Sequence, residues 1–274
     1  MSGQLAGQVG LVTGGGRGIG AAIACALADE GMAVAVMSRS EAQLAATVAA
    51  IEQSGGHAIA VAGDVAQARD VDRVIHHVVG ELGPVDLLVN NAGRGPERFG
   101  PFWEADMDDW WKVLAVNLLG PALASRAVLP DMRARGRGRI VNIGSLSGGG
   151  TWDEAVSYVV SKAALMRLTD SLSSALKGSG VSVFELNPGL VRTALLDTHP
   201  DMFADLPDDA FTPVDKAASA VVRVAAGDLD VLRGRILDAD DDFDDLIARA
   251  AELRALDART LRVRTFGAHD PLEK

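Results

Sequence analysis

The sequence predicts a single α/β domain with a doubly wound parallel sheet of about seven strands and helices on both faces. Short apolar runs alternate with longer segments of helical periodicity from the N-terminus onward. The short runs are apolar throughout, which is typical of strands that are covered on both faces. No linker, internal repeat or low-complexity segment divides the 274 residues, so we expect one domain over residues 1–274.

The N-terminal half alternates strands and helices without interruption. VGLVT is a short β-branched run, and AVAVMS, HAIAVAGD and VDLLVNNAG are later apolar runs. The segments between them have apolar residues at helical spacing, and EAQLAATVAAIEQSG ends at a glycine, as helices often do. We therefore predict strands at 9–13, 33–38, 57–64 and 85–93, and helices at 21–31, 41–55 and 68–83.

The C-terminal half continues the alternation with longer helices. We predict a helix over 106–135 that breaks near Gly120–Pro121, and another over 155–177. RIVNIGS, VSVFELNPG and GRILDADDD predict strands at 139–145, 181–189 and 234–242, and a final charged helix follows. Loops are predicted at 93–101, 147–153 and 193–212, and the last is long enough to be a substrate lid. Right-handed crossovers place the loops that follow the strands at one edge of the sheet, where ligands bind.

Composition excludes several classes of function. The net charge is −11 with a pI near 4.9, and the sequence has no basic stripe of the kind that binds nucleic acid. Cys25 is the single cysteine, so no intrachain disulfide can form and a reducing compartment is favoured. No targeting pattern opens the chain and no apolar run reaches the ~18–20 residues of a membrane span, so we expect a cytoplasmic protein. The acidic block 238–245 lacks the turn glycine of a calcium loop, and we expect it to be solvated and no metal to be bound.

The stretch TGGGRGIG, residues 13–20, follows the first strand directly and opens the first helix. A glycine-rich turn alone indicates only a tight connection. In this context, however, bare backbone can approach a pyrophosphate, and the helix N-terminus attracts its negative charge. We therefore expect a dinucleotide to contact Gly14, Gly16, Arg17, Gly18, Ile19 and Gly20.

The second strand ends in MSRS, residues 37–40. An acidic residue near this place would bind both ribose hydroxyls of NAD and repel a 2′-phosphate. Ser38 and Arg39 stand there instead, and a guanidinium forms strong charge-assisted hydrogen bonds to phosphate. Arg17 offers a second cation on the same side. Unless both arginines are simply solvated, these residues favour NADP(H) over NAD(H).

Further motifs follow in a fixed order and together are far more specific than any one alone. They are TGxxxGxG at 13–20, Asp64–Val65, NNAG at 90–93, Asn117 in LAVNLLG, Ser145 in VNIGS, YxxxK from Tyr158 to Lys162, and NPGLVRT at 187–193. This set resembles the short-chain dehydrogenase/reductase (SDR) family over roughly residues 7–193, which implies a Rossmann fold. The resemblance adds these cofactor contacts: Asp64, Val65, Asn91, Ala92, Gly93, Tyr158, Lys162, Pro188, Gly189, Val191 and Thr193. The segment 228–274 diverges, because RILDADDDFDD replaces the glycine-rich ending common in the family.

The chemistry expected at this site starts from the chain's only tyrosine, Tyr158. A free tyrosine has a pKa near ~10 and is a poor base at neutral pH, but an adjacent ammonium favours the phenolate. Lys162 lies four residues on and therefore shares a helix face with Tyr158. The resemblance implies that Ser145 and Tyr158 bind a substrate carbonyl, that Tyr158 delivers the proton, and that Asn117 holds a water linking Lys162 to solvent. Ser147 is a rival for Ser145 at a shorter spacing.

The loops after the fourth, fifth and sixth strands should wall the substrate pocket, and they are mostly apolar. They offer Arg94, Leu146, Trp152, Leu190, Leu195, Met202 and Phe203. We therefore expect an NADPH-dependent carbonyl reductase for a hydrophobic ketone or secondary alcohol, although Arg94 could instead anchor an acidic group. The alternatives are a dinucleotide-sensing protein without turnover and a non-redox enzyme on the same scaffold. Family members often form dimers or tetramers, and Trp103, Trp110 and Trp111 would suit a subunit contact.

Overall fold

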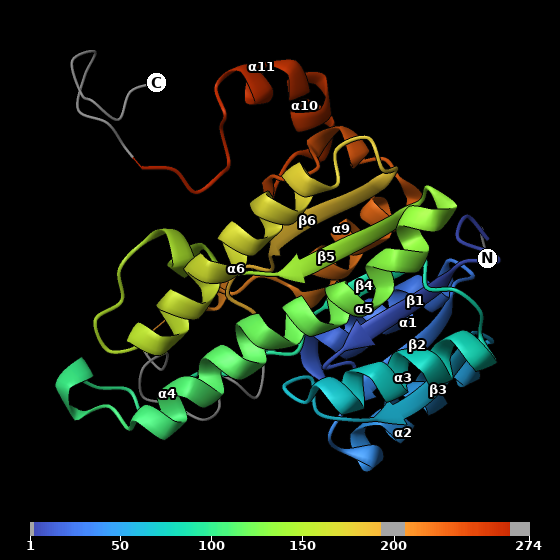
Figure 1. The fold of residues 1–274 in the computed structure, drawn as a ribbon, viewed down its shortest axis with the longest axis horizontal. Helices are drawn as coiled ribbons and strands as arrows, with labels where there is room; N and C mark the ends of the chain where they lie inside the picture. Colours follow the sequence, from blue (N-terminus) through green and yellow to red (C-terminus); the bar gives the residue numbers. More distant parts are fainter. Residues whose placement is uncertain (1–2, 193–205, 264–274) are drawn as a thin grey trace.

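The computed structural model describes residues 3–192 and 206–263. Seven parallel strands form one sheet in the order β3-β2-β1-β4-β5-β6-β7 (Figure 1). The strands are β1 (Val9–Thr13), β2 (Ala33–Ser38), β3 (His57–Ala62), β4 (Leu87–Asn90), β5 (Gly138–Ile143), β6 (Val181–Asn187) and β7 (Ile236–Asp238). This confirms the doubly wound parallel α/β sheet that the sequence predicts, and each predicted strand range overlaps one observed strand.

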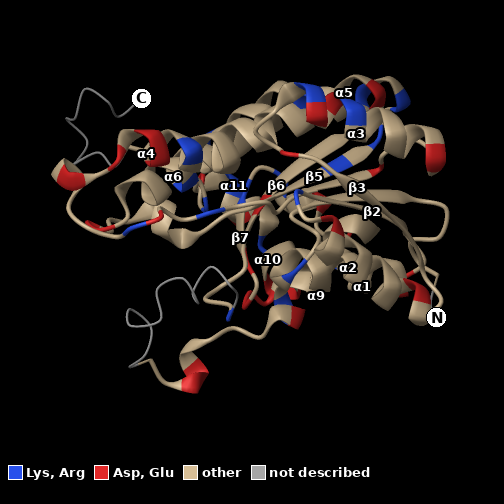
Figure 2. Ribbon diagram, turned by 90° about the horizontal axis from the view of Figure 1, so that it is seen from below, with Lys and Arg blue, Asp and Glu red and all other residues tan. Residues whose placement is uncertain are grey.

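Helices cover both faces of the sheet (Figure 2). On one face lie α1 (Gly18–Asp29), α2 (Glu41–Gln53), α9 (Val214–Ala226) and α10 (Phe243–Ala248), with α11 (Ala250–Ala255) following. On the other lie α3 (Ala68–Glu81), α4 (Met107–Leu114), α5 (Gly120–Arg135) and α6 (Val156–Ala175). Because central strands such as β1, β4 and β6 are covered by helices on both faces, their side chains are buried on both sides, whereas the edge strand β3 keeps exposed residues.

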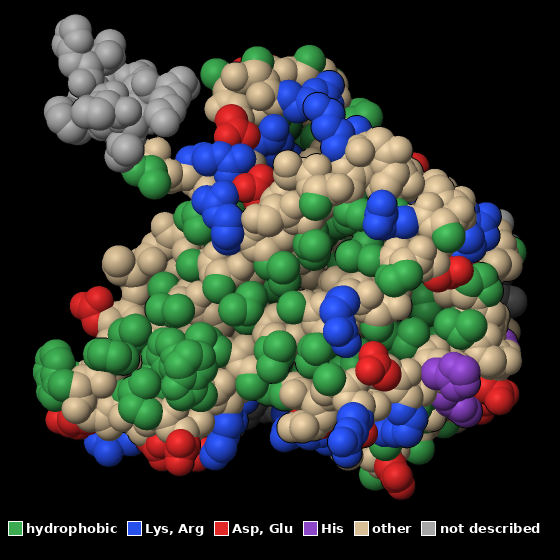
Figure 3. Space-filling model, viewed as in Figure 1, with side chains coloured by type: hydrophobic (Ala, Val, Ile, Leu, Met, Phe, Trp, Pro, Cys, Tyr) green, Lys and Arg blue, Asp and Glu red, His purple; other side chains and the backbone are tan. Residues whose placement is uncertain are grey.

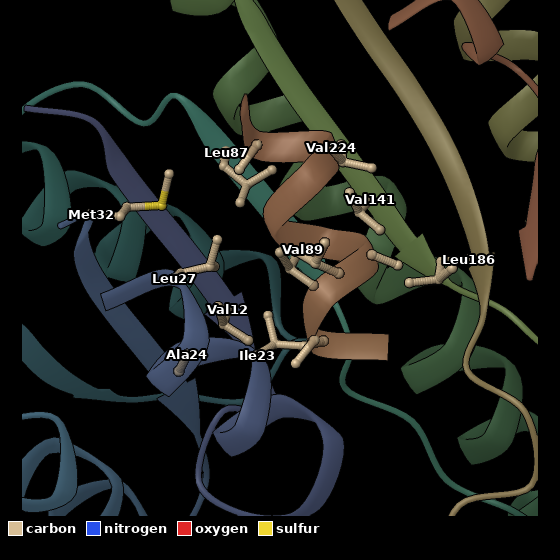
Figure 4. Close-up of a cluster of buried hydrophobic side chains, with 14 of the residues drawn as sticks. Val12, Ile23, Ala24, Leu27, Met32, Leu87, Val89, Val141, Leu186 and Val224 are labelled. Carbon is tan, nitrogen blue, oxygen red and sulfur yellow. The ribbon is translucent and has the colours of Figure 1, made fainter. Parts of the chain in front are cut away.

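Alternate strand residues enter two separate cores. Val12, Val89, Val141 and Leu186 pack against α1 and α9, where Leu27 and Val224 meet them (Figure 4). Their neighbours in sequence, such as Leu11 and Leu88, point to the opposite core against α3 and α5. The period-2 alternation of side chains along a strand explains this division.

The long helix after β4 differs from the sequence prediction in one detail. Instead of a break near Gly120–Pro121, a π-helical turn spans Ala115–Leu119 and α5 continues directly from it. Pro121 sits in the first turn of α5, where its missing N–H costs no hydrogen bond. Gly120 is also close to Val65, since a Cβ at residue 120 would lie 3.0 Å from the valine Cγ2. π-turns are often found at functional sites, and this one contains Asn117.

The same helix contains an apolar window that passes for a membrane span on length and composition alone. The mean hydropathy of this window is 1.5, but length and composition alone are weak evidence for a membrane span, because core helices pass the same test. The α5 half, however, contributes Ala124, Val128 and Met132 to the core under the sheet. Packing against the sheet therefore accounts for the apolar character of this half.

The acidic block 238–245 is mostly engaged in contacts within the fold rather than merely solvated. Its contacts are Asn187–Asp238, Lys216–Asp240, Arg259–Asp241, Arg223–Asp244 and Arg249–Asp245, and Asp242 caps α10. The Arg259 guanidinium donates to both oxygens of Asp241, at 2.6 and 2.8 Å. In the described part of the chain, no group of three or more His, Cys, Asp or Glu side chains is placed to hold a metal ion. These contacts assign the block to anchoring the C-terminal segment.

Candidate active site

A cleft of ≈ 720 Å³ opens at the carboxyl edge of the sheet. The strand order reverses between β1 and β4, and in doubly wound sheets ligands bind at such a point. Most of the predicted cofactor residues line the cleft: Gly14, Gly16, Arg17, Gly18, Ile19, Ser38, Arg39, Asp64, Val65, Asn91, Ala92, Gly93, Tyr158, Lys162 and Pro188. Gly20, Gly189 and Val191 lie outside its lining. Thr193, Leu195, Met202 and Phe203, and most of the predicted lid, lie outside the described residues.

The glycines of the turn are required by close backbone contacts. A Cβ on Gly20 would lie 2.3 Å from the Gly14 carbonyl oxygen and 2.4 Å from Asn91 Nδ2. Gly14 has φ +65°, a conformation that side chains disfavour. Gly16 leaves room beside Ser38, because a Cβ there would lie 3.2 Å from its Oγ. The turn is therefore a bare backbone surface at the start of α1, which suits a pyrophosphate.

Asn91 ties this turn to the loop after β4. Its Nδ2 donates to the carbonyls of Thr13 and Gly14 at 3.0 and 3.2 Å. The Thr13 hydroxyl in turn accepts from the backbone amides of Asn91 and Ala92, both at 3.1 Å. These bonds explain why β4 ends at Asn90 rather than at residue 93. The NNAG motif thus shapes the cleft wall in addition to lining it.

Two exposed arginines stand at the rim of the cleft. Arg17 precedes α1 in extended conformation, and Arg39 follows β2. Within residues 3–192 and 206–263, neither guanidinium has an ion pair or hydrogen bond. The Ser38 side chain bonds instead to the backbone of Ser40, which caps α2. Among the described residues, the rim therefore presents two positive charges without an ion-pair partner, and Ser38 rather than a carboxylate stands at the end of β2.

Tyr158 and Lys162 project from the first turns of α6 into the same cleft. The Lys162 Nζ lies 5.6 Å from the centre of the Tyr158 ring and donates to the Ile143 carbonyl at 2.8 Å. Lys162 is only 6% exposed, so its charge acts in a low-dielectric setting. The loop after β5 packs tightly on this part of α6, because a Cβ on Gly148 would lie 2.7 Å from the backbone of Lys162.

Ser145 follows β5 and caps the short 3₁₀ helix Leu146–Gly149. Its Oγ lies 2.9 Å from the Oγ of Ser147 and accepts from the Ser147 amide at 3.3 Å. The structure thus brings the two rival serines into one hydrogen-bonded pair. Asn187 holds the same loop, since its Oδ1 accepts from the Leu146 amide at 3.3 Å while its Nδ2 donates to Asp238.

Asn117 is 1% exposed, and its amide is used within the protein. Its Oδ1 accepts from the Arg94 amide, and its Nδ2 donates to the Arg94 carbonyl, both at 2.9 Å. The second Nδ2 hydrogen goes to Ser161 Oγ at 3.0 Å. The side chain therefore joins the loop after β4 to α6, one residue before Lys162.

Aromatic side chains lie next to Tyr158. The Trp152 ring meets the tyrosine ring edge to face, with centroids 6.4 Å apart, and stacks on Phe99 at 5.2 Å. Leu146, the residue after Ser145, is 56% exposed. Arg94 lines the cleft, but its guanidinium pairs with the buried Asp109. The arginine that might have anchored an acidic substrate thus has an internal carboxylate partner.

Sequence reasoning missed one charged group at this site, Glu185 of β6. It is 0% exposed, and burial raises the pKa of its carboxyl from 4.5 to about 7, against the opposing effects of Lys162 and of a hydrogen bond from Thr169. The available signal was a single acidic residue inside the otherwise apolar run VSVFEL. Such a residue is rarely buried without a specific partner.

Comparisons with known proteins agree with this site. The family model described as short chain dehydrogenase matches residues 8–202. A short chain dehydrogenase of Pseudocercospora fijiensis is 42% identical over 197 residues, which cover 70% of this chain and 62% of that protein. The short-chain reductase NovJ of Streptomyces niveus is 39% identical, with 79% of this chain and 81% of the relative covered.

A solved structure shows the same architecture. The chain superposes on a variant of actinorhodin polyketide ketoreductase solved with NADPH at a TM-score of 0.81, with 30% identity. The match covers 87% of this chain and 97% of the other. With the family model matching well over half of its length, the chain belongs to the short-chain dehydrogenase family and is an oxidoreductase acting on alcohol and carbonyl groups.

Proposed function

We propose that the protein is an NADPH-dependent carbonyl reductase. The observation that carries this proposal is one cleft that contains the glycine turn, the Tyr158–Lys162 pair and two arginines that form no ion pair with any described residue. The dinucleotide fits these residues, because a Cβ at Gly20 or Gly14 would close the turn, and Arg17 and Arg39 offer charge to a 2′-phosphate. The adenine and ribose end of the dinucleotide would be held by Asp64, Val65 and the NNAG loop. When bound, the reduced nicotinamide supplies hydride to the substrate carbonyl carbon.

The chain's own residues then handle the carbonyl oxygen. Ser145 and Tyr158 donate hydrogen bonds that polarise the carbonyl and stabilise charge as it develops on oxygen. Tyr158 transfers its proton to that oxygen as a general acid. Lys162 stabilises the phenolate that is left and would also bind the nicotinamide ribose. The water-holding role of Asn117 in proton resupply remains a prediction. Because both amide hydrogens of its side chain are used within the protein, Asn117 would have to hold that water through an oxygen atom.

Replacing Tyr158 with Phe tests the proton donor. The ring and its contact with Trp152 are kept while the hydroxyl is lost, so kcat should fall by at least about 100-fold. NADPH affinity, followed by the fluorescence of the reduced nicotinamide, should stay near the wild-type value. Wild-type turnover in Tyr158→Phe across a panel of ketones would refute the assignment.

Replacing Arg39 with Ala tests the cofactor preference. Loss of a charge-assisted contact to the 2′-phosphate should weaken NADPH by about 10- to 100-fold and leave NADH nearly unchanged. Arg69→Ala is a matched control, because Arg69 is also exposed but lies on α3 outside the cleft. Equal losses for NADPH and NADH would argue against the proposed preference.

The substrate is proposed to be a hydrophobic ketone or secondary alcohol. Trp152 and Phe99 place an aromatic surface beside Tyr158, and the internal pairing of Arg94 makes it a weak anchor for an acid. A panel that contrasts acetophenone with ketones bearing a carboxylate or phosphate tests this class. Preference for the charged ketones would refute it.

We propose a homo-oligomer formed through the α4 surface. Phe102 and Trp103 precede α4, Met107 and Trp111 lie on it, and all four are 48–84% exposed. Hydrophobic side chains gather on the face of the molecule where α4 lies (Figure 3). Patches of this kind commonly mark protein contacts. Light scattering on the wild type and on Trp103→Ser would decide whether this face joins subunits. A cytoplasmic location is proposed separately, because Cys25 is the single cysteine and a chain that can form no intrachain disulfide suits a reducing compartment.

A further inference from the structure

Strand β6 carries a carboxyl group where its pattern calls for an apolar side chain. Val181 and Val183 belong to the core on the α5 side, whereas Phe184 and Leu186 belong to the opposite core. Glu185 therefore continues the Val181–Val183 row, toward α6, and is 0% exposed. A buried carboxyl in such a row requires a partner, a proton or a function.

The surroundings of Glu185 leave room for the carboxyl but provide a hydrogen-bond donor for only one of its two oxygens. Gly144 makes this space, because a Cβ there would lie 2.2 Å from Glu185 Oε1. Thr169 Oγ1 donates to Oε2 at 3.2 Å. Oε1 has no hydrogen-bond partner in the described residues. The site is therefore shaped for a glutamate without neutralising it.

Lys162 is the charged group that acts on Glu185. Across the sheet, Glu185 pairs with neutral Asn142 on β5 and apolar Ile236 on β7. The Glu185 amide donates to the Arg235 carbonyl, but the Arg235 side chain binds Asp257 instead. From α6, Thr169 donates to the carboxyl, and the positive charge of Lys162 opposes the rise that burial causes in the pKa of Glu185.

Geometry links Lys162 to both groups. Its Nζ lies 5.6 Å from the centre of the Tyr158 ring, and the Ile143 carbonyl that it binds precedes Gly144, where a Cβ would lie 2.2 Å from Glu185 Oε1. An anion near an ammonium offsets part of the positive potential that the ammonium exerts on other groups. The ionisation of Glu185 must therefore oppose the stabilisation of a Tyr158 phenolate by Lys162.

We propose that Glu185 is a positioning residue of the reaction, whose carboxyl adjusts, through the Lys162 ammonium, how readily Tyr158 gives up and regains its proton. The inference rests on the proposed function for its consequence in catalysis. Its physical core, the coupling between Glu185 and Lys162, can be measured without any turnover.

The coupling is tested by carbon-13 NMR of protein with labelled glutamate side-chain carboxyls. Glu185→Gln, or Glu185→Asp if the first does not fold, identifies the resonance. Because Lys162 favours the charged carboxylate, Lys162→Met should move the titration midpoint of Glu185 upward by about one pH unit or more. An unchanged midpoint in folded Lys162→Met protein would overturn the proposal.

The catalytic consequence is tested by the pH profile of alcohol oxidation, with 1-phenylethanol as the probe. Glu185→Gln removes a negative charge that disfavours the phenolate. The acidic limb of the pH–rate profile should therefore move to lower pH by about one unit. Val183→Ala is the matched control, because it perturbs the same row without changing charge and should keep the wild-type limb. A Glu185→Gln profile that overlays that of an active wild type refutes the positioning role. A wild type that oxidises no alcohol and reduces no ketone refutes the proposed function instead, and the NMR result still decides the coupling.

Discussion

The buried carboxyl of Glu185 should make the stability of this protein fall as pH rises toward neutrality. Burial raises its pKa from 4.5 to about 7 in the folded chain. Between these values the folded state keeps a proton that the unfolded state has released, so the stabilising contribution is full below 4.5 and lost above about 7. At about 1.4 kcal/mol per pKa unit, the whole effect on the free energy of unfolding is about 3 kcal/mol.

Glu185→Gln removes this titration while keeping the size of the side chain. Any packing cost of the amide is the same at every pH and cancels when the difference between variant and wild type is compared at two pH values. Between pH ~5.5 and ~8, the free energy of unfolding of the variant should rise by about 2 kcal/mol relative to that of the wild type. This is the part of the effect that falls in this pH window.

Urea unfolding followed by tryptophan fluorescence and circular dichroism would measure this difference, at one protein concentration so that subunit association does not contribute. Glu81→Gln, on the exposed end of α3, is the control and should show a difference that does not vary with pH. If the difference in the free energy of unfolding between Glu185→Gln and wild type stayed constant or fell as pH rises, burial would not be holding the proton on this carboxyl.

Two other perturbations test the geometry of the cleft. Gly20→Ala places a Cβ 2.3 Å from the Gly14 carbonyl oxygen, so we expect NADPH affinity measured by fluorescence to fall by at least about 10-fold; unchanged affinity would mean that the turn does not cradle the cofactor. Ser145→Ala should lower kcat/KM for ketone reduction by about 100-fold, whereas Ser147→Ala, which removes only the hydrogen-bonded neighbour at 2.9 Å, should have a much smaller effect. Steady-state kinetics would measure both variants. A larger loss for Ser147→Ala than for Ser145→Ala would assign the catalytic role to Ser147 instead.

Much of the fold could be predicted from local patterns, because strand and helix periods are written in consecutive residues. The errors occur where distant contacts compete with those patterns. The strand over 85–93 ends at Asn90 because the next residues bond to Thr13 instead of continuing the ladder. The irregularity expected near Gly120–Pro121 lies at the π-turn around Asn117, which also bonds to Arg94 and Ser161.

The order of motifs along the chain was enough to indicate the family, the nucleotide turn and the Tyr158–Lys162 pair, because each of these depends on residues close in sequence. Only the tertiary structure showed that Glu185 is buried with Gly144 making room for it, and that Asp241 and Asp244 pair with arginines distant in sequence. Such neighbours are set by how strands and helices stack, and burial then determines how strongly their charges act on one another, a quantity that no local pattern contains.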